Sequence, residues 1–267
     1  MKMPTLGMGT FRLQGDVAYQ SVKLALAEGY RHIDTAQIYG NEAEVGQAIA
    51  DSGLVRSEIF ITTKVWLDNL TADKFIASVQ HSLAKLQTDY VDLLLIHWPT
   101  GADGVPMATY LPLLAQAKQL GLTRQIGVSN FTIAQIDQAI SLLGSGEIYT
   151  NQIEVHPYLQ NRKVIAHNQA NGIIVTGYMP LAVGKVFADP VLQRIATETG
   201  YSISQIVLSW VLSQGLVAIP SSTKQVNLAD NFSAGNITLT PEHIAVIAQL
   251  EAGERIANPD FAPKWDE

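Results

Sequence analysis

The sequence contains no cysteine among its 267 residues, which excludes disulfide bonds, thiolate metal sites and cysteine nucleophiles. Basic residues are few, because 17 Lys and Arg stand against 24 Asp and Glu and leave a net charge of −7. No cluster of Lys and Arg interrupts this acidic balance. We therefore expect neither a nucleic acid nor an anionic membrane surface as a partner, since either would need a basic patch.

Long apolar runs and a signal sequence are also missing. A membrane helix needs about 18 consecutive apolar residues, and the richest run, Ile173 to Leu181, is interrupted by threonine, glycine and proline. The N-terminus carries one positive charge and then proline and glycines, where a signal peptide would have its apolar core. We expect a cytoplasmic protein without a membrane segment.

Hydrophobic residues, in contrast, are abundant. They make up 47% of the chain, and charged residues make up 15%. This composition supports a large core and argues against long disordered stretches. The length allows one or two domains, but α/β barrels of about 250 residues form a single domain.

Short β-rich runs recur along the whole chain, and each is followed by a helical pattern. This alternation predicts repeated βα units whose parallel strands are buried on both faces. The eight expected strands are Leu6 to Phe11, His32 to Ala36, Ile59 to Lys64, Val91 to His97, Gln125 to Ser129, Asn151 to Val155, Ile174 to Tyr178 and Leu216 to Pro220.

Signals at helix ends support the same architecture. Asn41 with a glutamate three residues later resembles a capping box. Asp189 before a proline and Ser202 before a glutamine indicate two helices between the seventh and eighth strands, and Thr240 begins a last helix. We predict one domain, residues 1–267, with the α/β fold of a (β/α)8 TIM barrel and extra helices after strand 7 and after the last barrel unit. A doubly wound open sheet is the weaker alternative.

Four ionisable residues lie where strands of this barrel end. Asp34 ends the second strand with Tyr39 in the loop after it, Lys64 ends the third and His97 ends the fourth. The carboxyl ends of barrel strands form the functional face. The lysine ammonium would lower the pKa of the tyrosine toward neutrality, the aspartate would hold the lysine, and the histidine could orient a carbonyl oxygen. Taken singly, each residue could be a solvated or core residue, but the combination favours proton transfer.

Six motifs are spread along the chain, namely Leu6–Phe11 (LGMGTF), Asp34–Glu42 (DTAQIYGNE), Thr63–Trp66 (TKVW), Asp92–Pro99 (DLLLIHWP), Ile126–Phe131 (IGVSNF) and Asn151–Glu154 (NQIE). With these motifs the sequence resembles the aldo-keto reductase family over nearly its whole length, and within it the short bacterial 2,5-diketogluconate reductases, particularly the B type. The resemblance implies that Asp34, Tyr39, Lys64 and His97 are the catalytic tetrad, with Tyr39 as general acid.

The resemblance also implies a nicotinamide dinucleotide held by the barrel itself, because no Gly-x-Gly-x-x-Gly fingerprint follows a strand. Ser129, Asn130 and Gln152 would bind the carboxamide, and the Tyr178 ring would stack on the nicotinamide. Taken singly, these could equally be strand-end or core residues. The other implied cofactor-binding residues are Thr10, Met179, Leu181, Gly184, Lys185, Ser221, Ser222, Thr223, Lys224, Asn227, Asp230 and Asn231.

The expected adenosine-phosphate site departs from the family pattern. Many members have a lysine at Ser221 and an arginine at Asn227. Lys224 must therefore carry more of the charge for a 2′-phosphate, assisted by Ser222, Thr223 and the N-terminus of the helix that follows. NADPH is still expected over NADH. Met179 stands where serine is usual, so a contact there would come from the backbone.

The loops that select the substrate are short at Pro99 to Tyr110, Leu181 to Pro190 and after Glu254. We expect an open pocket for a small polar carbonyl compound, with His97 as a contact and Phe11, Trp66 and Trp98 as walls, although aromatic residues can simply plug a barrel.

The leading hypothesis is an NADPH-dependent reductase of small aldehydes or keto sugar acids, including 2,5-diketo-D-gluconate to 2-keto-L-gulonate, and methylglyoxal. An NADPH-binding regulatory module with little turnover is the alternative. A hydrolase using Asp92 or Glu154 is disfavoured, since Asp92 starts its strand and no metal-ligand cluster accompanies either. We expect a monomer without a metal ion.

Overall fold

The computed structural model describes residues 1–101 and 103–266. Eight parallel strands follow one another in sequence order around one sheet. Hydrogen bonds from Gly7 and Gly9 to the eighth-strand region, at 2.9 and 3.0 Å, close the sheet into a barrel. The strands are β1 (Met8–Gly9), β2 (His32–Asp34), β3 (Phe60–Val65), β4 (Val91–Ile96), β5 (Thr123–Ser129), β6 (Ile148–Glu154), β7 (Ile174–Tyr178) and β8 (Val217–Ala218).

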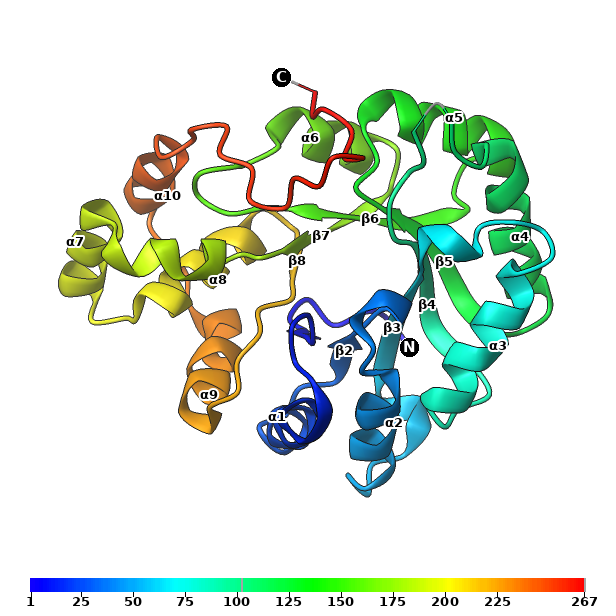
Figure 1. Cartoon of the computed structure of the whole chain (residues 1–267). Helices are drawn as coiled ribbons and strands as arrows, with labels where there is room; N and C mark the ends of the chain where they lie inside the picture. The colour runs from blue at the N-terminus through cyan, green and yellow to red at the C-terminus, as the bar shows by residue number, and fades with distance from the viewer. Residues whose placement is uncertain (102, 267) are drawn as a thin grey trace.

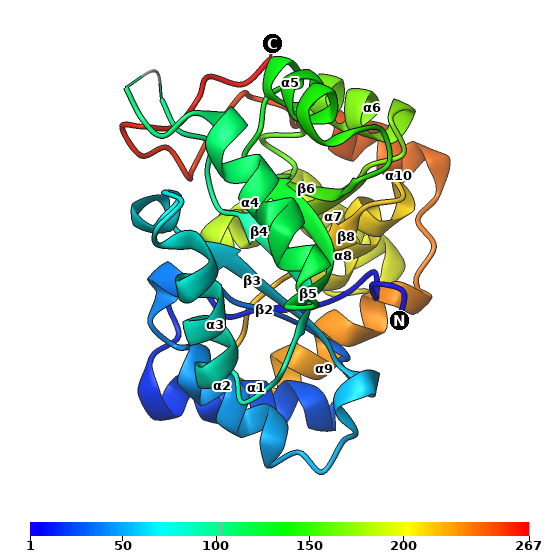
Figure 2. The same ribbon diagram turned by 90° about the vertical axis from the view of Figure 1, so that its right-hand side faces the viewer.

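Helices surround the barrel on its outside, as Figures 1 and 2 show from two directions. The helix after each strand returns the chain to the start of the next, which is the connection that parallel strands require. They are α1 (Gly15–Ala27), α2 (Glu42–Ala50), α3 (Phe75–Lys85), α4 (Met107–Gln119), α5 (Ile133–Leu143), α6 (Arg162–Ala170), α7 (Pro190–Thr199), α8 (Ile203–Ser213), α9 (Gln225–Ser233) and α10 (Pro241–Ala248).

The predicted (β/α)8 fold is therefore confirmed. The extra helices also occur where they were expected, with α7 and α8 between β7 and β8, and α10 after the last unit. Their starts follow the sequence signals, since the side chains of Asp189, Ser202 and Thr240 each accept a backbone N–H of the helix that follows. No helix among the described residues is long and apolar enough to cross a membrane.

The capping box expected at Asn41 is wrong. The Asn41 side chain makes no cap bond to α2. Its amide instead donates to the carbonyl oxygens of Thr10 and Leu13, at 2.9 and 2.8 Å, and its oxygen accepts the Thr35 hydroxyl. A buried amide is better satisfied by three hydrogen bonds of this kind than by one helical N–H, and here the amide ties the loop after β1 to the loop after β2.

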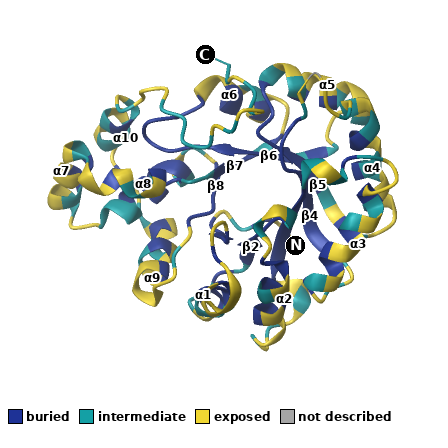
Figure 3. Cartoon of the chain, in the orientation of Figure 1, coloured by how far each residue is buried: buried dark blue, intermediate teal, exposed yellow. Residues whose placement is uncertain are grey.

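The strands are buried on both faces, as the blue ribbon of Figure 3 shows. Their outward side chains pack against the helices in one continuous core. A second, smaller apolar cluster fills the barrel interior, so the barrel is not a pore. Its buried members are Met3, Phe60, Leu93, Leu95, Val217 and Ile219.

A histidine inside the barrel makes the stability depend on pH. Burial lowers the pKa of His32 from 6.5 to about 4, and its Nδ1 has no hydrogen-bond partner. Below pH 6.5 the imidazole of His32 therefore binds a proton in the unfolded chain, whereas in the folded protein it does so only near pH 4. Acidification from pH 7 to 4 should cost about 3 kcal/mol of unfolding free energy through this residue.

Urea unfolding at several pH values measures this effect. The variant His32→Gln should lose less stability on acidification than the wild type, because glutamine does not titrate. Equal losses in the two proteins would contradict a role for His32.

Candidate active site

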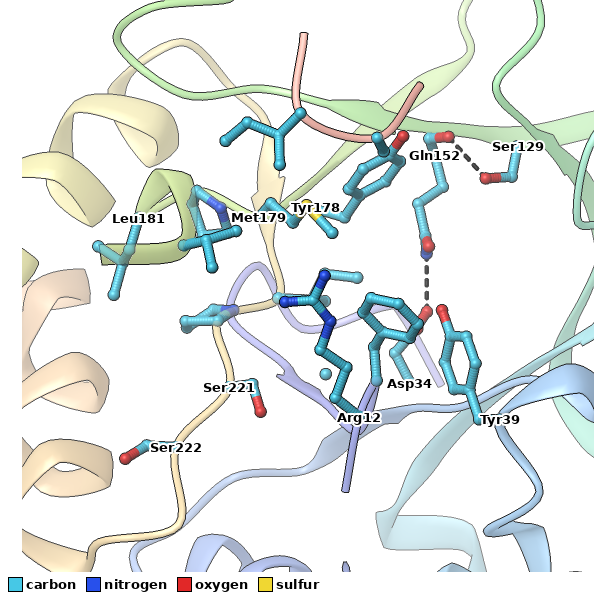
Figure 4. Close-up of a pocket in the computed structure, with 18 of the residues that line it drawn as sticks. Arg12, Asp34, Tyr39, Ser129, Gln152, Tyr178, Met179, Leu181, Ser221 and Ser222 are labelled. Carbon is cyan, nitrogen blue, oxygen red and sulfur yellow. Dashed lines mark hydrogen bonds between the residues drawn. The ribbon is translucent and has the colours of Figure 1, made fainter. Parts of the chain in front are cut away.

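The polar residues that the sequence placed at strand ends meet at one mouth of the barrel, around a cavity of about 930 Å³. Asp34 ends β2, and Tyr39 follows it in the short helix η1 (Gln37–Tyr39). His97 directly follows β4, and Gln152 lies near the end of β6. Figure 4 shows the Asp34, Tyr39 and Gln152 side chains converging from these different elements.

Lys64 is buried next to the cavity, where it contacts Asp34 and Tyr39, two of the residues that line it. Its ammonium is 2.5 Å from an Asp34 carboxylate oxygen and 3.3 Å from the Tyr39 hydroxyl, and it also donates to the Thr35 carbonyl at 2.8 Å. The Lys64 side chain is 0% exposed, so water cannot screen these interactions. The second Asp34 oxygen accepts the Gln152 amide at 2.7 Å. The carboxylate is thus fixed from two sides.

These contacts set the protonation states of the site. Burial raises the pKa of the Tyr39 hydroxyl more than the Lys64 ammonium lowers it. The expected net lowering is therefore wrong for the protein without substrate, because desolvation dominates. Burial alone would lower the pKa of Lys64, but Asp34 and Tyr39 together raise it above its ordinary value. At neutral pH, Tyr39 carries its proton and Lys64 its charge.

The loop that carries Tyr39 is held in place by its neighbours. The Gln37 side-chain oxygen accepts the Trp66 backbone N–H at 2.9 Å, and the Gln14 amide donates to the Tyr39 carbonyl at 2.7 Å. Gly40 follows with φ of 68°, a conformation that glycine adopts without strain. Tyr39 is therefore presented from a rigid turn.

His97 lines the cavity beside Tyr39. The two rings meet edge to face at 5.5 Å, and Trp66 packs against His97 in the same way at 5.2 Å. Burial, and then the nearby Lys64 charge, lower the pKa of His97 well below its ordinary value. A neutral imidazole with an unpartnered buried Nδ1 results. Such a ring can donate its N–H to a carbonyl oxygen, but it does not carry the extra proton of a general acid.

The aromatic residues expected as walls, Phe11, Trp66 and Trp98, all line the cavity. Phe261 from the C-terminal segment joins them, with its ring 6.0 Å from Trp66 and 5.6 Å from Trp98. The part of the cavity next to Tyr39 and His97 is therefore walled by aromatic rings.

The amide cluster at the ends of β5 to β7 is already hydrogen-bonded within itself. Ser129 donates to the Gln152 carbonyl at 2.8 Å, Asn130 donates to Ser129 and to the His97 carbonyl, and Tyr178 donates to the Asn130 side-chain oxygen at 2.7 Å. All four residues line the cavity. They offer exchangeable donors and acceptors and one aromatic ring, which suits a planar carboxamide-bearing ring.

The other end of the cavity lies against the loop before α9. Most of the residues expected there line it, namely Met179, Leu181, Gly184, Ser221, Ser222, Asn227, Asp230 and Asn231. The first N–H groups of the nine-residue helix α9 have no side-chain cap, and such groups favour phosphate. The hydroxyls, amides and helix start thus fit an extended dinucleotide.

Four of the expected cofactor residues do not line the cavity. Thr10 is fully buried and donates to the Asp34 carbonyl at 3.0 Å. Lys185 turns to the C-terminal segment, where it pairs with Glu254. Thr223 and Lys224 are exposed on the surface.

Sequence reasoning missed Arg12, and it named the segment after Glu254 as a substrate loop without identifying the residues that line the cavity. Figure 4 shows the Arg12 side chain reaching into the cavity, and it is the only Lys or Arg among the described lining residues. Its position next to Phe11 was a signal that could have been used. Ile256, Ala257 and Phe261 also line the cavity, but they lie in irregular structure with no strand nearby in sequence.

The paired carboxylates considered for hydrolysis are not free. Asp92 lies at the start of β4, away from the mouth, and accepts Arg56 at 2.8 Å and the Ile61 N–H at 3.0 Å. Glu154 is fully buried and accepts two backbone N–H groups. Neither is available as an acid or base at the cavity.

Comparisons with known proteins agree with this geometry. The model of the aldo/keto reductase family matches residues 5–252. A methylglyoxal reductase DkgB of Yersinia pestis is 54% identical over 100% of both chains. An aldo-keto reductase of Mycolicibacterium vanbaalenii is 40% identical, over 97% of this chain and 91% of that one.

Solved structures are similar as well. A crystal structure provisionally assigned as 2,5-diketo-D-gluconic acid reductase B has a TM-score of 0.95 and 44% identity, covering 99% of this chain and 94% of that chain. A Bombyx mori aldo-keto reductase in complex with NADP has a TM-score of 0.89 and 35% identity, covering 98% and 95%. The chain belongs to the aldo-keto reductase family and is an oxidoreductase.

Proposed function

We propose that this protein reduces small aldehydes and ketones with NADPH, methylglyoxal and keto sugar acids such as 2,5-diketo-D-gluconate among them. The observation that carries the proposal is the buried Lys64 ammonium, which contacts both Asp34 and the Tyr39 hydroxyl at the edge of the cavity. The names of the relatives from Yersinia pestis and of the 2,5-diketo-D-gluconic acid reductase B support the choice of substrates.

In this proposal Tyr39 donates its proton to the carbonyl oxygen. The phenolate that remains is stabilised by the Lys64 ammonium, whose orientation Asp34 fixes. Neutral His97 donates its ring N–H to the same oxygen and orients the carbonyl. Bound NADPH supplies the hydride that reaches the carbonyl carbon.

Members of the family generally use NADP(H). For this chain we propose that Ser129, Asn130 and Gln152 bind the carboxamide and that Tyr178 stacks on the nicotinamide ring. Leu181 and Gly184 would cover the diphosphate, and the loop from Ser221 to Lys224 would receive the 2′-phosphate at the start of α9. The cytoplasmic location, the monomeric state and the single domain expected from the sequence remain parts of the proposal.

A substrate screen tests the function. Purified protein should oxidise NADPH with methylglyoxal or 2,5-diketo-D-gluconate, and turnover with NADPH should exceed turnover with NADH. Absence of NADPH oxidation with these compounds and with simple aromatic aldehydes would contradict the proposal.

The preference for NADPH can be separated from dinucleotide binding in general. Lys224 is exposed at the N-cap of α9, from which its ammonium can swing onto a 2′-phosphate. Lys224→Ala should therefore weaken NADPH binding by about tenfold, the value of one charged hydrogen bond, and leave NADH binding unchanged. Fluorescence titration with both cofactors measures this.

Arg12→Ala is the matched control, because Arg12 enters the cavity itself and should affect both cofactors alike. Equal losses of NADPH and NADH affinity in Lys224→Ala would contradict the phosphate role of Lys224.

A further inference from the structure

A buried carboxylate outside the proposed chemistry holds the C-terminal segment of the chain. Glu154, the last residue of β6, is 0% exposed. One of its oxygens accepts the Ile256 backbone N–H and the other accepts the Ala257 backbone N–H, each at 2.7 Å. Both oxygens of one carboxylate are thus used on two successive amides that lie about a hundred residues away in sequence. Bonds of this kind are charge-assisted and therefore strong.

A histidine fixes the orientation of this carboxylate. The Nδ1 atom of His156 accepts the Tyr158 N–H at 3.3 Å, so Nε2 carries the ring proton. Nε2 lies 2.8 Å from Glu154 and donates to it. The Tyr158 carbonyl in turn accepts the N–H groups of Ala252 and Glu254, at 3.1 and 3.0 Å. The segment 154–158 therefore holds the segment 252–257 by accepting hydrogen bonds from four of its backbone N–H groups.

The segment 252–257 continues directly into a wall of the cavity. Ile256, Ala257, Pro259 and Phe261 all line it, and Phe261 packs on the aromatic rings that line the substrate end. Glu154 itself is not among the described residues that line the cavity. Glu154 therefore acts on a substrate only through its neighbours, and its side-chain bonds to Ile256 and Ala257 lead to the C-terminal segment.

We propose that Glu154 is a positioning residue that sets the substrate pocket by holding the Ile256–Ala257 backbone. The effect on KM rests on the proposed carbonyl-reductase function. The effect on the mobility of the C-terminal segment does not, because it is measured without a substrate. The arrangement separates two tasks, since the Asp34–Lys64–Tyr39 cluster lies on β2, β3 and η1, and the wall is held from β6. Loss of the hydrogen bonds from Ile256 and Ala257 to Glu154 should weaken substrate binding and leave the reacting groups in place.

Glu154→Gln tests the proposal, because the amide is nearly the same size but can accept only one of the two N–H groups and turns a donor toward the other. The KM for a substrate that reaches Phe261, such as an aromatic aldehyde, should rise about tenfold, while kcat changes by less than about twofold. NADPH affinity should stay unchanged.

Asp92→Asn is the matched control. Asp92 is also a buried carboxylate that accepts a backbone N–H, but it lies at the other end of the barrel. It should lower stability without raising KM. The same kinetic pattern in both variants, or a fall of kcat at constant KM in Glu154→Gln, would overturn the proposal.

Two further measurements distinguish loss of the Glu154 hydrogen bonds from a general loss of stability in Glu154→Gln. Phe261→Ala, on a side chain that is 41% exposed, removes the wall itself. The double variant Glu154→Gln with Phe261→Ala should then raise KM by less than the product of the two single increases. An increase equal to that product would overturn the proposal. Hydrogen exchange of residues 252–261 should be faster in Glu154→Gln and unchanged in Asp92→Asn. This exchange is read without substrate, so failure here is distinguishable from failure of the reductase activity.

Discussion

Replacement of Tyr39 by phenylalanine is expected to lower kcat for carbonyl reduction by between about 100-fold and 10,000-fold, the range that general acid catalysis supplies. The hydroxyl is the proton source in the proposed reaction, and it contacts Lys64 at 3.3 Å. The ring remains, so its contacts with Phe11 and His97 are retained. Steady-state kinetics with methylglyoxal measure the loss.

The same variant should bind NADPH as the wild type does, because the amide cluster and the α9 loop are untouched. Its unfolding midpoint should also change little. Turnover comparable to that of the wild type would show that another group donates the proton, and the assignment of Tyr39 would then be wrong.

Replacement of Lys64 by methionine should affect both rate and stability. The rate should fall because the phenolate left on Tyr39 loses its counter-charge. The unfolding free energy should fall by about 3–5 kcal/mol, because Asp34 is left as a buried carboxylate without its ammonium partner. Urea unfolding and single-turnover kinetics measure the two effects separately.

A double variant separates these effects further. Asp34→Asn combined with Lys64→Met removes the orphaned charge, so it should recover much of the lost stability and none of the lost rate. Recovery of activity in the double variant, or no loss of stability in Lys64→Met, would contradict the account of the buried pair.

Much of the barrel was predictable because its repeated units are local. Each strand is a short apolar run, and Asp189, Ser202 and Thr240 mark the helices that follow by their side-chain caps. The convergence of Asp34, Lys64 and His97 followed from the rule that the carboxyl ends of barrel strands share one face. The alternation of apolar runs and helical patterns therefore predicted the fold, and the positions of polar residues at strand ends predicted the cluster.

What could not be predicted depends on burial and on contacts between distant segments. The direction of the Tyr39 pKa shift required knowing that desolvation outweighs the Lys64 charge. The pairing of Lys185 with Glu254, and the grip of Glu154 on Ile256 and Ala257, join segments whose spacing in sequence has no periodicity. Asn41 has the composition of a cap but bonds to the loop after β1 instead.

The central claim is that this barrel passes a hydride from NADPH to a carbonyl carbon while Tyr39 supplies the proton. The most direct measurement uses NADPH deuterated at the reactive carbon, with methylglyoxal as substrate and the Tyr39→Phe variant as control. The wild type should place deuterium from one face of the cofactor on the carbonyl carbon of the product, in an amount equal to the NADPH consumed, and the variant should form almost no product. A product without deuterium, or no NADPH consumption by the wild type, would contradict the account.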